Sequence, residues 1–474
     1  MGTARLLATG SARIASTLER RARHRLAPAS LAAGCWWLTL LTCTLGAGRQ
    51  LGIGGHGNTI HLYLSDLPLL CTLGIWTAML LLHPNPAIRF GPRPTVLALA
   101  GLLSLALIGT PFAAHPELSR GMAARLGLLL AFYLYTVNHP PSARAMAGAL
   151  LGALALQLAV ALSQIVRQGS LGLGLLGERH LDLTVPRIAV ISAYGRHWLR
   201  PYGLTAHPNL LGGMVAVCLL PLTFALPSRL AGWGLGCAVA LLAITLSRGA
   251  WLAALAAVAV YVLASRVGRP RLSWASLALA VALLAGTMLG PPRTAIFARF
   301  NLADPLEQQS ILERLGSLRD AAALIGGHPL LGVGANGYVA AERARAGLSV
   351  TGGEYVPVVH NAVLLAMAEL GLAGGPLLAL ALGWPAWRAI RDGDTGIHAA
   401  LAAGLAAGLV AGMVDFTPWA SPSFRLLWVA LLGLWAADVP AGSTASSQPA
   451  RKTGAVPALR LPDPRPPWGG RRGG

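Results

Sequence analysis

The chain has 474 residues, of which 55% are hydrophobic and 11% are charged, and its mean hydropathy is +0.60. Soluble proteins of this length are far more polar, so lipid must cover much of the surface. A net charge of +20 would suggest nucleic-acid binding in a soluble protein, but membrane proteins gather basic residues beside their cytoplasmic ends. The composition therefore predicts a polytopic, all-α membrane protein and argues against a nucleic-acid partner.

The amino-terminal segment, residues 1–30, is rich in arginine and precedes the first apolar stretch. No small-residue cleavage site follows that stretch, which favours a retained anchor over a cleaved signal peptide. We therefore expect residues 1–30 to form a basic cytoplasmic segment.

Apolar stretches recur along residues 31–437, and about twelve of them approach the roughly 20 residues that a helix needs to cross a bilayer. The expected spans are residues 31–48, 62–82, 95–110, 121–137, 145–166, 209–226, 230–246, 249–264, 273–290, 361–385, 397–414 and 423–437.

The arginines predict the orientation of these spans. With the amino terminus inside, the short inner connections and both termini collect most of the basic residues, as the positive-inside rule requires. Both termini are then cytoplasmic, and the two long hydrophilic interruptions, residues 167–208 and 291–360, lie outside the cytoplasm. Loops of this length in a compact protein are usually functional or disordered.

The second outer loop contains a helical pattern. Apolar residues recur on one face, and Gly326 and Gly327 before Pro329 supply a stop. The expected apolar face consists of Ile311, Leu315, Leu318, Ala322 and Ile325. We expect an amphipathic helix on the outer membrane surface.

The carboxyl-terminal residues, 438–474, are rich in Pro, Gly, Ser and Arg, which predicts a disordered, basic cytoplasmic tail. Gly404, Gly408 and Gly412 recur once per turn in the eleventh span, which favours close helix packing. The five cysteines fall in apolar spans without metal-ligand spacing, so they predict no metal site.

Two familiar motifs carry no function here. Gly332, Gly334 and Gly337 spell GxGxxG, but they lie in an outer loop without the strand that a dinucleotide site requires, so we interpret them as a turn. Asp392 and Asp394 spell DxD, but they lie in a short inner loop without a soluble domain and are interpreted as a solvated turn.

Three outer segments place polar residues directly before spans that run inward. These segments are RPYGLTAHPNLLGG with Arg200, His207 and Asn209, TLSRGAW with Ser247 and Arg248, and HNAVLLAMAELG with His360 and Asn361. Helix amino termini carry partial positive charge, and arginine matches phosphate with a fork of donors. If the three helix starts converge, they form an anion pocket.

His360 is the candidate base, because a histidine exchanges protons near neutral pH without a large pKa shift. A structural role as a helix cap remains an equal alternative for His360 and is favoured for His207. Glu369 lies about two and a half turns beyond His360, so it cannot be its direct partner. For Glu369, Asp66 and Asp415, functional and structural roles stay open.

In their order, these segments resemble the O-antigen ligase and polymerase superfamily of bacterial membrane glycosyltransferases. The resemblance rests on the three segments above together with ERLGSLRDAAALIGGHPLLGVGANGY, and it spans roughly residues 31–437. It implies a glycosyltransferase C-like membrane fold with two long extracytoplasmic loops, in the cytoplasmic membrane.

The resemblance also implies the reaction. The donor would be a polyprenyl pyrophosphate-linked glycan, and the glycan would pass with inversion to a hydroxyl of a glycan or glycolipid acceptor at the outer face, as in lipopolysaccharide or other surface polysaccharide biosynthesis. Arg200 and Arg248 would hold the pyrophosphate, and His360 would orient or deprotonate the acceptor hydroxyl. Asn361, Ser247, His207 and Asn209 would support them, without a metal or another cofactor.

Three alternatives remain at the level of the sequence, and one of them is a noncatalytic member of the family that only binds lipid-linked glycan. A polysaccharide polymerase of the same superfamily differs from a ligase only in its acceptor. A transporter of small anions or glycans would suit about twelve spans with intramembrane acids, although the chain lacks the internal repeat that many transporters have.

Overall fold

A computed structural model of the protein describes residues 28–51, 60–84, 86–185, 187–193, 196–265, 305–349 and 355–437. The chain divides into two compact units, Met1–Pro440 and Ala441–Gly474, and all described residues belong to the first. The expected tail (438–474), the expected ninth span (273–290) and residues 1–27 of the basic segment lie outside the described residues.

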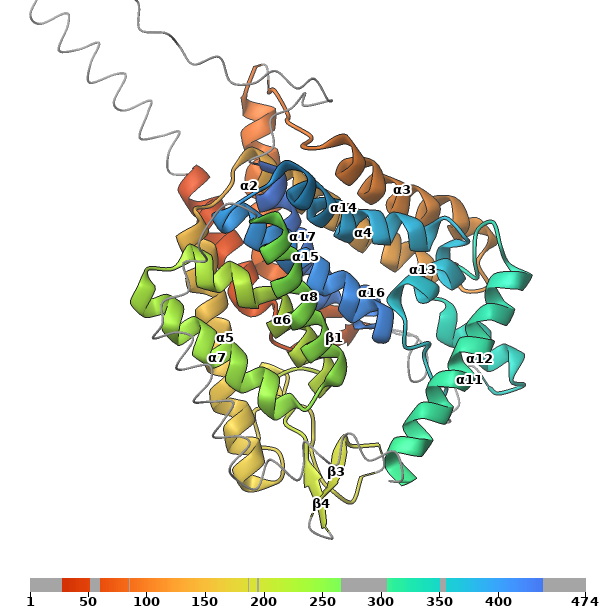
Figure 1. Ribbon diagram of the computed structural model, residues 1–474. Coiled ribbons are helices and arrows are strands. Elements are labelled where there is room, and N and C mark those ends of the chain that lie inside the picture. Colours follow the sequence, from red (N-terminus) through yellow and green to blue (C-terminus); the bar gives the residue numbers. More distant parts are fainter. Residues whose placement is uncertain are drawn as a thin grey trace, which may run out of the picture. The chain divides into compact units, whose positions relative to one another are not determined.

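The described residues are mostly helical (Figure 1). The helices that precede the first long loop are residues 28–42, α2 (Asp66–Leu82), α3 (Arg93–Gly109), η1 (Thr110–Phe112), α4 (Pro116–Asn138) and α5 (Ala143–Arg167). The later helices are η2 (Gly174–Leu176), α6 (Pro208–Ala225), α7 (Ser228–Thr245), α8 (Arg248–Ala264), α11 (Pro305–Gly327), α12 (Tyr338–Arg345), α13 (Ala362–Leu370), α14 (Gly374–Asp392), α15 (Gly396–Val414), α16 (Thr417–Ala420) and α17 (Pro422–Ala437).

Among the described residues, five helical segments are long and apolar enough to cross a bilayer: Arg93–Phe112, α5, α6, α7 and α15. Helices α2, α8 and α17 are apolar but shorter. The protein is therefore a multi-pass membrane protein with a mainly α-helical fold, as the composition predicts.

Two short antiparallel hairpins modify the all-α expectation. Strands β1 (Gly48–Leu51) and β2 (Ile60–Tyr63) pair Gly48 with Tyr63, and β3 (Val190–Ala193) and β4 (Arg196–Leu199) pair Val190 with Leu199. The first expected span, 31–48, is correspondingly too long, because its helix ends at residue 42 and the chain then extends into β1. Figure 1 shows the β3–β4 hairpin below α6 and α8.

The expected tenth span, 361–385, is wrong as a single helix. The chain breaks between α13 and α14, where Gly371 has φ +82°. A Cβ at Gly371 would lie 2.2 Å from the carbonyl oxygen of Leu330, and Leu372 N–H donates to the carbonyl of Pro329 at 2.8 Å. The turn after α11 therefore packs against this break, and only glycine fits there.

Helix α6 is the centre of the bundle, because most of its residues are buried and it packs against α7, α8 and α15. A Cβ at Gly404 of α15 would lie 2.5 Å from the carbonyl oxygen of Val217 on α6. The glycine spacing in α15 thus allows the close backbone approach that the sequence predicts.

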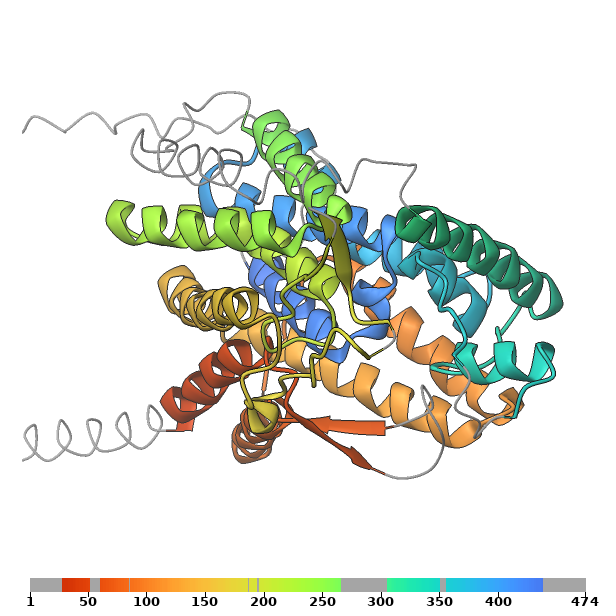
Figure 2. The same ribbon diagram turned by 90° about the horizontal axis from the view of Figure 1, so that it is seen from below.

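The second outer loop contains α11, which ends at Gly327, where the sequence predicts the helix to stop. Ser317, Ala321 and Leu324 pack inward, whereas Leu315 is 52% exposed and Leu318 is 39% exposed. Viewed from below in Figure 2, α11 runs along one side of the molecule. Its apolar stripe therefore faces away from the rest of the protein.

Candidate active site

Helices α6, α8 and α13 begin close together, around the end of α15. Ala362 N–H at the start of α13 donates to the carbonyl of Asp415 at 3.2 Å. Asn209 Nδ2 in the first turn of α6 donates to Oδ2 of the same aspartate at 3.2 Å. Ser247 and Arg248 at the start of α8 line a recess together with Asn209 and Asp415. The three helix starts that the sequence singles out are thus brought to one place.

A polar side chain caps each of these helix starts. His207 Nδ1 accepts from Asn209 N–H at 3.1 Å, and Ser247 Oγ accepts from Ala250 N–H at 3.4 Å. Asn361 Oδ1 accepts from the N–H groups of Val363 and Leu364, both at 2.9 Å. Each cap fixes the backbone where its helix begins.

Arg200 is buried and bonds to the carboxyl end of α7. Its Nε and Nη2 donate to the carbonyl of Thr245 at 3.0 and 2.8 Å, and Nη2 also donates to Oδ1 of Asn209 at 2.8 Å. A cation at this position satisfies a terminal helix carbonyl and faces the negative end of the helix dipole. Arg200 therefore joins the first outer loop to both α6 and α7.

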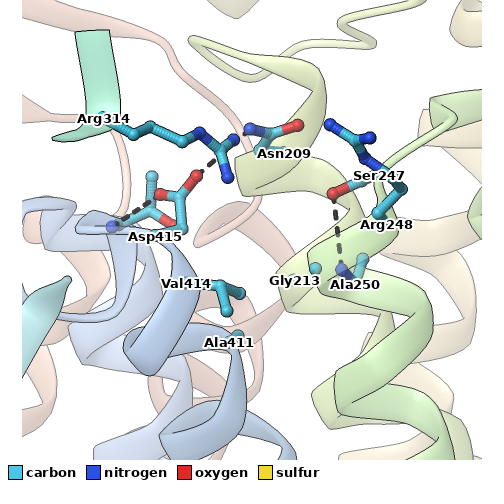
Figure 3. A pocket seen from close by; sticks show the side chains of 11 residues that line it. Asn209, Gly213, Ser247, Arg248, Ala250, Arg314, Ala411, Val414 and Asp415 are labelled. Atoms are coloured by element: carbon cyan, nitrogen blue, oxygen red, sulfur yellow. Dashed lines mark hydrogen bonds between the residues drawn. The ribbon is translucent and has the colours of Figure 1, made fainter. Parts of the chain in front are cut away.

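Asn209 links a cation to an anion. It accepts from Arg200 and donates to Asp415, whose Oδ1 in turn accepts from Thr417 N–H at 2.9 Å. Figure 3 shows this arrangement, with the Asn209 and Asp415 side chains facing each other across the pocket. The chain of bonds runs from the first outer loop through α6 to the connection between α15 and α16.

Arg248 and Ser247 line a small recess of about 30 Å³. Asn209, Asp415 and Arg314 of α11 line the same recess. Figure 3 shows the Arg314 side chain extending toward Asp415 and Asn209, with Ser247 and Arg248 beyond Asn209. Two guanidinium groups thus reach this recess from opposite sides.

A second, much larger cavity of about 1200 Å³ adjoins the recess. The two share Asn209, Arg314, Asp415 and Thr417 as lining residues. Arg200, His207 and His360 line only the large cavity. This volume exceeds the usual range of ligand pockets, about 300 to 1000 Å³, so it has room for parts of two substrates.

His360 lies directly before Asn361, the cap of α13, and is half-buried beside Phe416, whose ring centroid is 5.4 Å away in an edge-on arrangement. Its Nδ1 is buried and has no hydrogen-bond partner among the described residues. Burial and the Arg314 charge lower the pKa of His360, while Asp415 and Glu313 oppose the shift. The imidazole is therefore neutral near pH 7, as a proton acceptor must be.

His207 differs from His360 in its titration. Burial, with a further contribution from the Arg200 charge, lowers the pKa of His207 to about 3. The ring therefore remains neutral at physiological pH and serves as a cap, which agrees with the preference from the sequence.

Comparison with protein families supplies an independent observation. Residues 233–379 match the family model described as O-antigen ligase. This match confirms the resemblance seen in the sequence, for a segment that makes up less than a third of the 474 residues. A comparison with curated proteins found no match.

The O-antigen ligase segment covers part of the candidate site. It contains Ser247, Arg248, Arg314, His360 and Asn361. Arg200, His207, Asn209 and Asp415 lie outside it, and the fold brings them to the segment. Arg314 was not predicted as a site residue, because its position falls on the polar surface of the expected amphipathic helix. It lies in ERLGSLRDAAALIGGHPLLGVGANGY, one of the segments that carry the family resemblance, and this is the signal that could have revealed it.

Two further acids have structural partners outside the cavity. Asp66 is buried and accepts two bonds from Arg125, at 2.9 and 2.8 Å. Glu369, within the O-antigen ligase segment, accepts from Trp419 Nε1 at 2.8 Å. These contacts favour the structural alternative for both acids, whereas Asp415 lines the site.

The two motifs set aside in the sequence analysis are turns. Gly332 has φ +65° and Gly334 has φ +100°, and Gly334 N–H donates to the carbonyl of Glu369 at 3.1 Å. Asp392 pairs with Arg388, and Asp394 contacts His398 Nδ1 at 2.6 Å. Within the described ranges, no three His, Cys, Asp or Glu side chains gather as a possible metal site.

Proposed function

We propose that this protein transfers a glycan from a polyprenyl pyrophosphate donor to an acceptor hydroxyl at the outer face of the cytoplasmic membrane. The observation that carries the proposal is the meeting of Arg248, Arg314 and Arg200 with neutral His360 around one pair of adjoining cavities. Membership of residues 233–379 in the O-antigen ligase family supports the same class of reaction.

The pyrophosphate would lie in the large cavity at the mouth of the recess, because the recess itself, at about 30 Å³, is too small to hold it. Arg248 and Arg314 line the recess, and so do Asn209 in the first turn of α6 and Gly249 in the first turn of α8. Arginine forks and helix amino termini stabilise phosphate charge, and they do so most where charge develops in the transition state. Arg200 would act mainly by holding Asn209 and the end of α7, because its bonds to Thr245 and Asn209 already engage its Nε and Nη2.

His360 would accept the proton of the acceptor hydroxyl. The acceptor oxygen then bonds to the anomeric carbon, while the bond from that carbon to the phosphate oxygen breaks and its electron pair leaves with the pyrophosphate. Attack from the face opposite the leaving group inverts the anomeric centre. Arginines and helix ends supply the charge stabilisation in this proposal, so it requires no metal ion.

The acceptor distinguishes a ligase from a polymerase. A ligase would use a glycolipid such as a lipid core, and a polymerase would use a growing glycan. We place the ligase first because the family model that matches is described as O-antigen ligase. The orientation in this proposal, with both termini cytoplasmic, follows from the distribution of arginines.

The test is a transfer assay with purified protein, a polyprenyl pyrophosphate-linked glycan and candidate hydroxyl acceptors, in detergent that contains EDTA. We expect transfer by the wild type and by His328→Ala, an exposed histidine of the same outer loop that does not line the cavities. We expect His360→Ala to lose transfer by about 100-fold or more, since general-base catalysis typically contributes that much.

Two results would contradict the proposal. Equal transfer by the wild type and a folded His360→Ala would remove His360 from the mechanism. Absence of transfer with every acceptor, together with glycan or anion flux into vesicles, would favour the transporter.

A further inference from the structure

The first outer loop contributes two arginines to the lining of the large cavity. The proposed reaction gives neither of them a role. Arg179 and Arg187 line this cavity but not the recess that contains Arg248. Arg179 is exposed and has no hydrogen-bond or ion-pair partner in the described part of the chain, although its charge acts on His207. A lone guanidinium that faces a large cavity is available to a ligand.

The acids nearest to Arg179 in sequence are engaged elsewhere. Glu178 is buried and accepts from Gln164 Nε2 at 2.9 Å and from the backbone N–H groups of Leu171 and Leu173. Asp182 accepts from the N–H and the hydroxyl of Thr184, both at 2.8 Å. The carboxylates closest to Arg179 in sequence therefore accept hydrogen bonds from other groups and form no ion pair with it.

Arg187 is held in place by an aromatic ring. Its guanidinium carbon lies 3.6 Å from the centroid of the Tyr355 ring, and its backbone has φ +69°, which is unusual for a residue other than glycine. Stacking occupies the face of a guanidinium and leaves its in-plane N–H groups for planar oxyanions. Tyr355 thereby orients Arg187 in the cavity before a ligand arrives.

The cavity wall as a whole is cationic. Among its described lining residues the carboxylates are Glu313 and Asp415, and Asp415 is already bonded to Asn209 and Thr417. Four arginines line the same wall: Arg179, Arg187, Arg200 and Arg314.

We propose that Arg179 and Arg187 bind an anionic group, a phosphate monoester or a carboxylate, on the acceptor. The inference rests on the proposed transfer reaction, because it assigns the part of the large cavity beside Arg179 and Arg187 to the acceptor and the part at the mouth of the recess to the donor pyrophosphate. The two compartments share a wall of Asn209, Arg314, Asp415 and Thr417. An acceptor anchored at Arg179 and Arg187 would present its hydroxyl to His360, which lines the same cavity.

The test measures binding without donor, so its result does not depend on transfer. Protein in lipid nanodiscs is titrated with a trisaccharide that carries one phosphate monoester, with the same trisaccharide carrying one carboxylate, and with the neutral trisaccharide. We expect both anionic probes to bind at least about tenfold more tightly than the neutral probe, because charged hydrogen bonds are the strong ones.

The variants locate the binding. Arg179→Gln combined with Arg187→Gln is expected to abolish the preference for anions, and Arg196→Gln, an exposed arginine of the same loop outside the cavities, is expected to retain it. Arg248→Gln tests whether the two sites are separate, because Arg248 lines only the recess. This variant is also expected to retain the preference for anionic probes. Thermal unfolding of each variant establishes that it is folded.

Several outcomes would overturn the inference. The first is equal affinity of the wild type for charged and neutral probes. The second is a loss of anion preference in Arg196→Gln as large as in the double variant. The third is a loss of anion preference in the single variant Arg248→Gln. Failure of the transfer reaction would appear separately, as absence of product with every acceptor while the anion preference persists.

Discussion

Asn209 on α6 donates a hydrogen bond of 3.2 Å to Asp415 at the end of α15, although the two residues are 206 positions apart in the chain. The same amide accepts from Arg200, so one side chain connects a cation of the first outer loop to the carboxylate beside α16. Positioning of the site therefore depends on an amide that lies at the boundary between both cavities.

Replacing this amide is expected to lower activity without unfolding the protein. Asn209→Ala removes both bonds, and the positions of Arg200 and Asp415 are then no longer fixed relative to each other. Displacements of about 1 Å at a catalytic site can reduce rates by about 100-fold, so we expect kcat/KM for transfer to fall between about tenfold and 100-fold. Steady-state kinetics at several acceptor concentrations measure this.

Asn138→Ala is the matched control, because Asn138 makes a comparable set of bonds, to Arg89 and Leu134, and does not line the cavities. If Asn138→Ala lowered kcat/KM as much as Asn209→Ala, Asn209 would support the fold as a whole and would have no specific role in positioning the site.

The pH profile of transfer should respond to the charges beside His360. Burial and Arg314 lower the pKa of His360, so the neutral base persists below pH 6.5 and activity is lost only as the pH falls through the lowered value. Arg314→Gln removes a repulsive charge, so we expect the acidic limb of kcat/KM to move to higher pH. Glu313→Gln removes an attractive charge and should move the limb to lower pH.

Both shifts are measured relative to the rate of each variant at its own optimum, since Arg314→Gln also lowers the maximum. Movement of the two limbs in the same direction, or no movement, would mean that another group titrates in the acidic limb.

The helix starts at the site could be predicted from the sequence alone. The sequence predicts helices from residues 209, 249 and 361, and α6, α8 and α13 begin at Pro208, Arg248 and Ala362. A polar cap followed by an apolar run is a local signal, so it survives without knowledge of the fold.

The inward face of α11 could not be predicted. Its apolar stripe, which includes Leu315 and Leu318, predicts only a face toward the membrane surface, whereas the protein packs against Ser317 and Ala321 and Arg314 lines the site. In a membrane protein the lipid is as apolar as the core, so periodicity does not reveal which face meets protein. The break at Gly371 was missed for a related reason, because the apolar pattern continues through it.

His207 should contribute stability as a cap. Because the pKa of His207 is about 3, the ring stays a neutral acceptor for Asn209 N–H across the physiological range. His207→Ala is expected to lower the free energy of unfolding by about 1 kcal/mol, and His207→Asn by less, because asparagine is a good cap. Thermal or denaturant unfolding in detergent measures both, and equal losses in the two variants would contradict the capping role.

Substitution in the pair of Asp66 and Arg125 distinguishes the proposed transferase from a transporter. The carboxylate is buried and accepts two bonds from one guanidinium, so Asp66→Asn leaves a partly buried cation without its partner. We expect a loss of about 3 kcal/mol in the free energy of unfolding, typical of a broken buried pair, with little change in transfer per folded molecule. Asp182→Asn, at a partly exposed loop position, controls for the substitution itself. A stable Asp66→Asn that loses vesicle flux would support a transporter.

Arg248 is expected to bind the pyrophosphate by its charge and by its geometry. Arg248→Gln removes both, so kcat should fall by about 100-fold to 1000-fold, the cost of losing one oxyanion donor in other enzymes. Arg248→Lys keeps the charge but loses the fork that matches phosphate, and it should retain intermediate activity. Inorganic pyrophosphate should raise the melting temperature of the wild type and of Arg229→Gln, an exposed arginine that lines neither cavity, but not of Arg248→Gln. If pyrophosphate stabilised Arg248→Gln as strongly as the wild type, the leaving group would have to bind elsewhere, and the recess would lose its assignment to the donor.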